Sequence, residues 1–159
     1  MKPHFITPLK NFACVPYVRK DKWNGQNWIT LTAIQVRMSD NSILTIPAGF
    51  ITNFGSIPRP VRGFLNRMGK SLRAFVVHDW LYSTNNGTTL KQRHCDDILY
   101  VLSREDGESW FDAQSINKGL MCGGWTCFKK SKPRVEPVAE SVIKTIATDN
   151  HYHIERYGI

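Results

Sequence analysis

Two apolar runs and the short turn between them decide the fold of the first half: Trp28-Ile29-Thr30-Leu31-Thr32-Ala33-Ile34-Gln35-Val36-Arg37, then Ser39-Asp40-Asn41, then Ser42-Ile43-Leu44-Thr45-Ile46. Both runs are rich in β-branched residues and have a rough period of two, which is typical of strands. The polar triplet between them supplies turn chemistry. These features predict an antiparallel β-hairpin.

The segments on either side of this hairpin extend the prediction. Phe12–Arg19 is a further candidate strand, followed by a polar turn over Asp21–Asn27 that contains Asn24-Gly25. Together with the hairpin it predicts an N-terminal antiparallel β-meander. After the hairpin, the prolines and glycine of Thr52–Pro60 resist regular structure and predict an ordered loop.

The second half of the chain has helical patterns. Apolar residues at helical spacing predict helices over about Ser71–Ser83, Leu90–Ser103 and Ser109–Leu120, and Asn85-Asn86-Gly87 ends the first. The predicted class is therefore α+β: a β-meander, then a packed helical half that contains a His–Asp helix pair. We predict one domain over residues 1–131 and a C-terminal extension over residues 132–159.

Composition fits one folded domain. The chain has 159 residues, of which 42% are hydrophobic and 21% charged, so it can bury one core. It lacks a run of 18 apolar residues, and its first residues lack the apolar region of a signal peptide, so neither a membrane span nor a signal is expected. Four scattered cysteines are too few for a disulfide scaffold, and reduced thiols are expected.

The charge of the chain is +8, and its distribution is uneven. Residues 41–78 and 113–135 contain no Asp or Glu, although each stretch carries several Lys and Arg. Basic stretches of this kind indicate an anionic partner, either lipid headgroups or nucleic acid, or else only a solvated basic face. The common nucleic-acid-binding motifs are not present in the sequence.

The main candidate for chemistry is His78-Asp79-Trp80-Leu81-Tyr82. His78 and Tyr82 are four residues apart and share one helix face. A helix joined to the next by a short turn packs antiparallel to it, which predicts that Asp97 lies within hydrogen-bonding distance of His78 and makes it a better base. The alternatives are a structural polar network and a divalent metal site that includes Asp79, with Asn53 from the loop.

Three ordered motifs carry a resemblance to a known family. They are Ile46–Arg59, Arg73–Tyr82 and Arg93–Asp97, and they resemble the DUF1353 family of small phage and prophage proteins over about residues 28–128. In that family's pattern an Asp usually follows the Thr of the first motif, whereas this chain has Asn53. The resemblance implies a phage origin and a virion or late-gene product.

A shorter stretch is similar to phospholipase A2 enzymes. Carried onto this chain, that likeness makes His78 the base that activates water, Asp79 a calcium ligand, Asp97 the group that orients the histidine and Tyr82 a supporting hydrogen-bond donor. The glycine-rich calcium loop and the flanking disulfides of those enzymes are missing from this sequence.

These features predict a phage virion component of the tail or tail–capsid region, present in the virion or in the host cytoplasm during infection. Its partners would be other virion proteins, and its His–Asp site would be structural, vestigial or hydrolytic. The alternatives are a phage-encoded hydrolase of lipid or cell envelope that uses His78 and Asp97, with a divalent cation such as calcium as its cofactor, and a basic nucleic-acid-binding accessory protein. The predicted binding residues are Arg59, Arg73 and Arg93.

The end of the chain is predicted to serve assembly. Residues 148–159 carry aromatic and aliphatic side chains with no evident core to join, and an exposed apolar tail needs a cover. It could add to the sheet edge of a neighbour or complete the chain's own meander.

Overall fold

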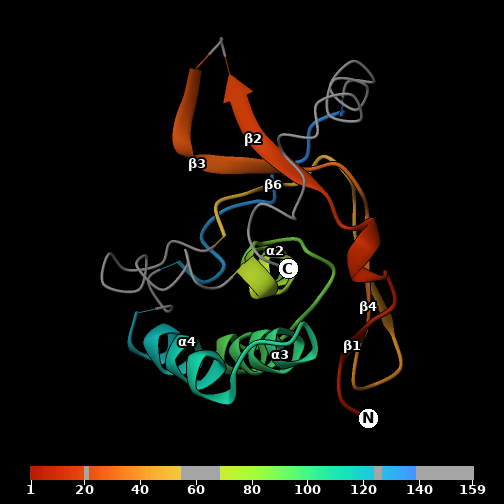
Figure 1. The fold of residues 1–159 in the computed structure, drawn as a ribbon, viewed down its shortest axis with the longest axis vertical. Coiled ribbons are helices and arrows are strands. Elements are labelled where there is room, and N and C mark those ends of the chain that lie inside the picture. Colours follow the sequence, from red (N-terminus) through yellow and green to blue (C-terminus); the bar gives the residue numbers. More distant parts are fainter. Residues whose placement is uncertain (20–21, 55–68, 124–126, 139–159) are drawn as a thin grey trace.

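The computed structural model describes residues 1–19, 22–54, 69–123 and 127–138 (Figure 1). One antiparallel sheet contains β1 (His4–Phe5), β4 (Ile34–Arg37) and β5 (Ile43–Ile46), in the order β1-β4-β5. Strands β4 and β5 form the predicted hairpin, with Val36 paired to Leu44. Because the inward residues alternate along β4, Ile34 and Val36 are fully buried.

A second antiparallel sheet contains β2 (Cys14–Arg19), β3 (Lys22–Thr30) and β6 (Ile51–Thr52), in the order β2-β3-β6. The β2–β3 register shifts between Pro16 and Val18. The N-terminal half is therefore made of antiparallel strands in two sheets, and not of a single meander.

Two details of the predicted strands are wrong. Trp28–Arg37 is not one strand, because the chain leaves β3 after Thr30 and starts β4 at Ile34. The physical reason is that the two halves belong to different sheets. Ile29 pairs with Val15 and Ile51 in the second sheet. Ile34 pairs with Ile46 in the first sheet and belongs to the main core. The predicted turn over 21–27 lies mostly inside β3.

The second half of the chain is helical, as predicted. The short 3-10 helix η2 (Gly69–Ser71) leads into α2 (Leu72–Tyr82), which is followed by α3 (Gln92–Glu105) and α4 (Trp110–Gly123). Another 3-10 helix, η1 (Leu9–Asn11), lies between β1 and β2 in the first half of the chain. Asn86 ends α2 by donating its side-chain amide to the carbonyls of Trp80, Leu81 and Ser83. Gly87 follows with φ of +78°, a backbone conformation that favours glycine.

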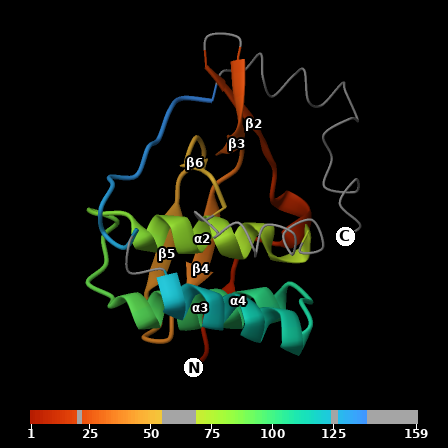
Figure 2. The ribbon, with the colours of Figure 1, turned by 90° about the vertical axis from the view of Figure 1, so that its left-hand side faces the viewer.

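Helix α2 runs through the middle of the molecule. Figures 1 and 2 show α3 and α4 on one side of it, the sheet of β2, β3 and β6 on the opposite side, and the sheet of β1, β4 and β5 along one flank. Eight of its residues are buried, including Phe75, Val76 and Val77, which are fully buried. A helix that is apolar on nearly every side is expected at the centre of a core. The predicted α+β class is confirmed, and among the described residues no helix is long and apolar enough to cross a membrane.

Residues 132–138, the first part of the predicted C-terminal extension, contact the segment that leads into β6. Val135 forms a bridge with Phe50, and the backbone N–H of Glu136 donates to the carbonyl of Gly49 at 2.9 Å. A Cβ atom at Gly49 would lie 1.9 Å from the carbonyl oxygen of Glu136, so this close approach needs a glycine. The segment through Val138 thus belongs to the folded body, and residues 139–159, with the predicted assembly tail, lie outside the described residues.

Candidate functional site

Helix α3 brings a carboxylate against the histidine of α2. The Nε2 atom of His78 lies 3.0 Å from Oδ1 of Asp96, and both side chains are only 2% exposed. Because an ionised carboxylate only accepts hydrogen bonds, the Nε2 atom carries the proton and donates a hydrogen bond to Asp96. The bond fixes both the tautomer and the orientation of the imidazole.

Tyr82 completes this group. Its hydroxyl donates to the same Oδ1 atom of Asp96 at 2.5 Å, and its ring lies 3.9 Å from the imidazole of His78, centroid to centroid. Burial, followed by the nearby Asp96 carboxylate, raises the pKa of Tyr82 above its ordinary value, so the phenol keeps its proton. We refer to these three residues as the His–Asp–Tyr network.

One atom of the network stays without a partner. Nδ1 of His78 is buried and makes no hydrogen bond within the described part of the chain. Buried polar atoms are nearly always hydrogen-bonded, so an exception points to a bound water, an ion or a chemical role. With Nε2 protonated, Nδ1 carries the lone pair that can accept a proton.

The prediction that Asp97 orients His78 is wrong by one position, because Asp96 makes this contact. Asp97 is exposed and lines a groove on the other side of α3, whereas its neighbour Asp96 faces His78. Successive helix residues are rotated by about 100°, so only one of the two carboxylates can face α2. The sequence signal for Asp96 was available: it shares the buried face of α3 with Leu99 and Ser103, at spacings of three and seven.

Further contacts hold the network in place. The Asn117 side chain of α4 donates to the backbone carbonyl of Asp96 at 3.1 Å. Phe128 packs edge-on against Tyr82 with ring centroids 5.2 Å apart, and the backbone N–H of Lys129 donates to the carbonyl of Tyr82. The thiol of Cys95 is also buried nearby, and burial raises its pKa to about 12, so it is not a thiolate. Neither Phe128 nor Asn117 was among the predicted site residues.

The predicted metal residues lie beside α2, close to one another. The hydroxyl of Thr52 donates to Oδ2 of Asp79 at 2.5 Å, and the backbone N–H of Asn53 donates to the same oxygen at 3.3 Å. Phe54 in turn donates its backbone N–H to Thr52 at 3.0 Å. The first residues of the predicted loop therefore do pack beside the His78 helix, while residues 55–59 lie outside the described ones.

This arrangement does not fit a calcium ion held by Asp79 and Asn53. Thr52 and the backbone of Asn53 both present hydrogen-bond donors to Oδ2 of Asp79, whereas calcium needs six to eight oxygen ligands. In residues 1–19, 22–54, 69–123 and 127–138, no three His, Cys, Asp or Glu side chains gather in a way that could hold a metal. Asp79 is thus a carboxylate anchored by the end of β6.

The predicted binding arginines that the structure describes differ in their exposure to solvent. Arg73 is a structural residue, because it is buried and its guanidinium binds Asp106 through Nε at 2.8 Å and through Nη2 at 2.5 Å. Its binding role is therefore a wrong prediction: burial between β1 and α3 leaves no free face. Arg93 is exposed at the start of α3, and Arg59 lies outside the described residues.

The three motifs that gave the resemblance come together in this fold, as Thr52 contacts α2 and α2 contacts α3. The profile of the family described as "Protein of unknown function (DUF1353)" matches residues 28–118, more than half of the chain. The chain belongs to the DUF1353 family. Comparison with curated proteins and with solved structures finds no match. The DUF1353 match spans β3 to α4 and therefore includes the whole His–Asp–Tyr network.

Proposed function

We propose that the chain is a phage-encoded hydrolase of acyl esters in lipids or the cell envelope, with His78 as its general base. The observation that carries this proposal is the unpaired, buried Nδ1 of a histidine whose Nε2 is bound to a buried carboxylate. A carboxylate on one imidazole nitrogen makes the other nitrogen a better proton acceptor.

The proposed reaction uses the Nδ1 atom of His78. His78 takes a proton from water through Nδ1 while the water oxygen attacks the carbonyl carbon of the ester. Asp96 stabilises the resulting imidazolium through its bond to Nε2, and Tyr82 keeps Asp96 oriented. The proton on Nδ1 then passes to the alcohol oxygen as the carbon–oxygen bond breaks, which yields a carboxylic acid and an alcohol.

Two features support this assignment. The spacing of His78, Asp79 and Tyr82 is similar to that of phospholipase A2 enzymes. Asp96 contacts His78 where this likeness expected Asp97 to do so. The charge of +8 favours an anionic substrate surface, because it raises the local concentration of anionic molecules.

The test uses two neighbouring carboxylates as a matched pair. Fatty acid release is measured from phosphatidylglycerol vesicles and from a short-chain soluble ester, with wild type, His78→Asn, Asp96→Asn and Asp97→Asn. We expect His78→Asn and Asp96→Asn to lose about 100-fold or more in rate, the usual contribution of a general base. Asp97→Asn should keep the wild-type rate. A wild-type protein that hydrolyses neither substrate, or a His78→Asn variant as active as wild type, would overturn the proposal.

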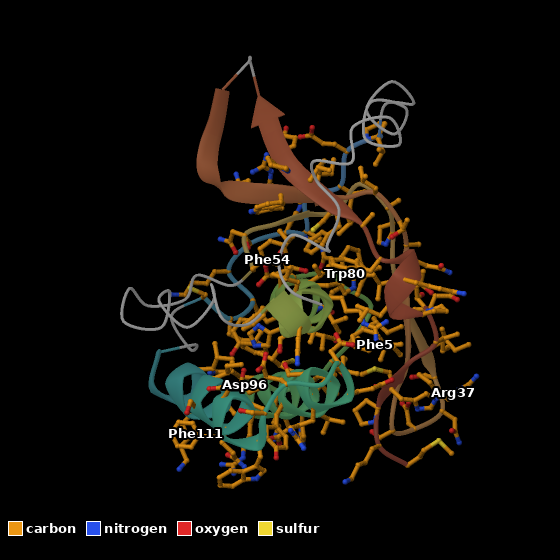
Figure 3. All side chains as sticks on the ribbon, in the orientation of Figure 1. Phe5, Arg37, Phe54, Trp80, Asp96 and Phe111 are labelled. Carbon is orange, nitrogen blue, oxygen red and sulfur yellow. The ribbon has the colours of Figure 1, made fainter. Side chains whose placement is uncertain are left out.

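A second candidate is a structural component of the phage particle at the tail or tail–capsid region. It is favoured by Trp110 and Phe111, which are 61% and 66% exposed at the start of α4 (Figure 3 labels Phe111). Contiguous exposed apolar surface is a common feature of sites that bind another protein. Mass spectrometry of purified particles should then detect the chain, and a Trp110→Ser/Phe111→Ser variant should fold but be missing from the particles.

A further inference from the structure

A groove of about 640 Å³ lies on the far side of α3 from the His–Asp–Tyr network. Its walls are the β4–β5 turn, the α2–α3 loop and the outer face of α3, and we call it the hairpin groove. Apolar side chains such as Met38, Leu44 and Ile98 line it, and Asp40 and Asp97 add carboxylates. This volume is within the range of ligand-binding pockets in proteins.

The hairpin groove runs along a sheet edge. Strand β5 is last in the order β1-β4-β5, and within the described residues its backbone pairs only with β4. Ser42, Ile43 and Leu44 line the groove, and Ile43 is 53% exposed. An open strand edge offers unpaired N–H and C=O groups to an added strand.

The groove has the opposite charge to the rest of the chain. Among the described lining residues there is no Lys or Arg, although the chain as a whole carries +8, and His94 is the other titratable group there beside the two carboxylates. Both carboxylates are at exposed positions, and hydrogen bonds from Ser42 lower the pKa of Asp40, so that it is ionised at neutral pH. Phosphate groups of lipids or nucleic acids would meet two negative charges here, whereas a Lys or Arg side chain would be attracted.

We propose that the hairpin groove binds an extended segment of a partner protein that alternates basic and apolar residues. The segment adds to the edge of β5, places apolar side chains against Leu44 and Ile98, and places Lys or Arg beside Asp40 and Asp97. Strand addition gives affinity through the backbone, and alternate side chains give specificity. This site does not depend on the proposed hydrolase, because the groove and the network use opposite faces of α3.

The test is a titration of the ¹⁵N-labelled full chain with the acetylated, amidated hexapeptide Lys-Val-Lys-Val-Lys-Val. We expect amide shifts to change at residues 38–44, 87–90 and 94–101. Asp97→Asn should weaken binding about threefold, the typical effect of one exposed ion pair. Asp112→Asn removes the same charge on α4 and should leave the affinity unchanged.

Two further peptides separate the components of the proposal without any change in the protein. A peptide with Glu in place of each Lys should not bind, and a peptide with alternate N-methylated amides should lose binding because it cannot pair with β5. Binding of the acidic peptide, equal binding of the N-methylated one, or shifts located outside the groove would each overturn the proposal. Shifts in the groove caused by phosphatidylglycerol vesicles or an oligonucleotide, with none from the basic peptide, would overturn it as well.

Discussion

Helix α2 carries two buried polar pairs that differ in one respect. Arg73 binds Asp106 near the start of the helix, and His78 binds Asp96 near its end. The members of both pairs are less than one-tenth exposed. Every nitrogen of the Arg73 guanidinium has a partner, whereas Nδ1 of His78 has none among the described residues.

We call the Arg73–Asp106 pair saturated, because each guanidinium nitrogen has a partner. The Nη1 atom of Arg73 donates to the carbonyl of Thr7 at 2.6 Å, and the guanidinium lies 3.6 Å from the centroid of the Phe5 ring. Glu105 accepts the backbone N–H of Phe5 at 3.0 Å, so β1 is fixed to both α2 and α3. Each guanidinium nitrogen of Arg73 has a partner, so this pair holds structure, whereas a pair with a buried acceptor left over can take a further partner. The His78 pair is therefore the one suited to chemistry.

The largest effect is expected from breaking the saturated pair. Arg73→Met keeps much of the side-chain volume but leaves the carboxylate of Asp106 buried without its cation. We expect a loss of about 3–5 kcal/mol in the free energy of unfolding, measured by urea denaturation at pH 7. The double variant Arg73→Met/Asp106→Leu should recover most of that loss, because no buried charge remains. A loss below about 1 kcal/mol for Arg73→Met would show that the pair does not hold the fold.

The next effect is a pH dependence that belongs to the same pair. Burial raises the pKa of Asp106 from 3.8 to about 6, although Arg73 opposes the rise. The folded chain therefore binds this proton more tightly than the unfolded chain does. The contribution of Asp106 to stability is greatest below about pH 4, falls as the pH rises from about 4 to 6, and is constant above that.

The size of this effect is at most about 3 kcal/mol, since one pKa unit corresponds to about 1.4 kcal/mol. Urea denaturation of wild type and Asp106→Asn between pH 4 and pH 7 measures it. The difference between the two curves should change in this range, with wild type losing stability relative to the variant as the pH rises. Parallel curves would contradict the raised pKa.

The sequence predicted the partner of His78 to within one residue, but it did not predict the partner of Arg73. Helices α2 and α3 follow from their apolar spacing and from the break at Asn85-Asn86-Gly87, because these signals are local. Asp106 could not be assigned to Arg73, since the two residues come from different elements, 33 positions apart. The two-sheet arrangement was missed for a similar reason: no Gly or Pro marks the change of sheet between Thr30 and Ile34.

The partner of His78 was missed by a single residue. The antiparallel packing of α2 and α3 was predicted, but the rotation of α3 about its axis depends on the loop before it and on the core that it joins. That rotation turns Asp96 inward with Cys95 and Leu99, and turns Asp97 outward. Sequence spacing therefore located the network to within one residue, and the tertiary packing selected the carboxylate.

The His78 pair is expected to contribute less to stability than the Arg73 pair. Asp96→Ala removes the acceptor of both His78 and Tyr82, which leaves two buried donors without a partner. We expect a loss of about 1–3 kcal/mol in the free energy of unfolding, less than for Arg73→Met because no buried charge is left alone. Asp97→Ala, one residue further along α3, should change it by less than about 0.5 kcal/mol. Equal losses for the two variants would contradict the assignment of Asp96 to the network.

The smallest effect is expected from Tyr82→Phe, which removes only the hydroxyl that donates to Asp96. The ring keeps its contacts with His78 and Phe128, and Asp96 keeps its bond to Nε2 of His78. Urea denaturation should therefore show a loss of about 0.5–1.5 kcal/mol, the usual net value of one hydrogen bond. The ¹⁵N shifts of the His78 ring should still report a protonated Nε2 and an unprotonated Nδ1. If instead Tyr82→Phe costs as much as Asp96→Ala, or if the His78 tautomer changes, then the tyrosine and not the carboxylate fixes the imidazole. The unpaired Nδ1 would in that case be a consequence of packing around Tyr82, and the contrast with the saturated Arg73 pair would lose its chemical meaning.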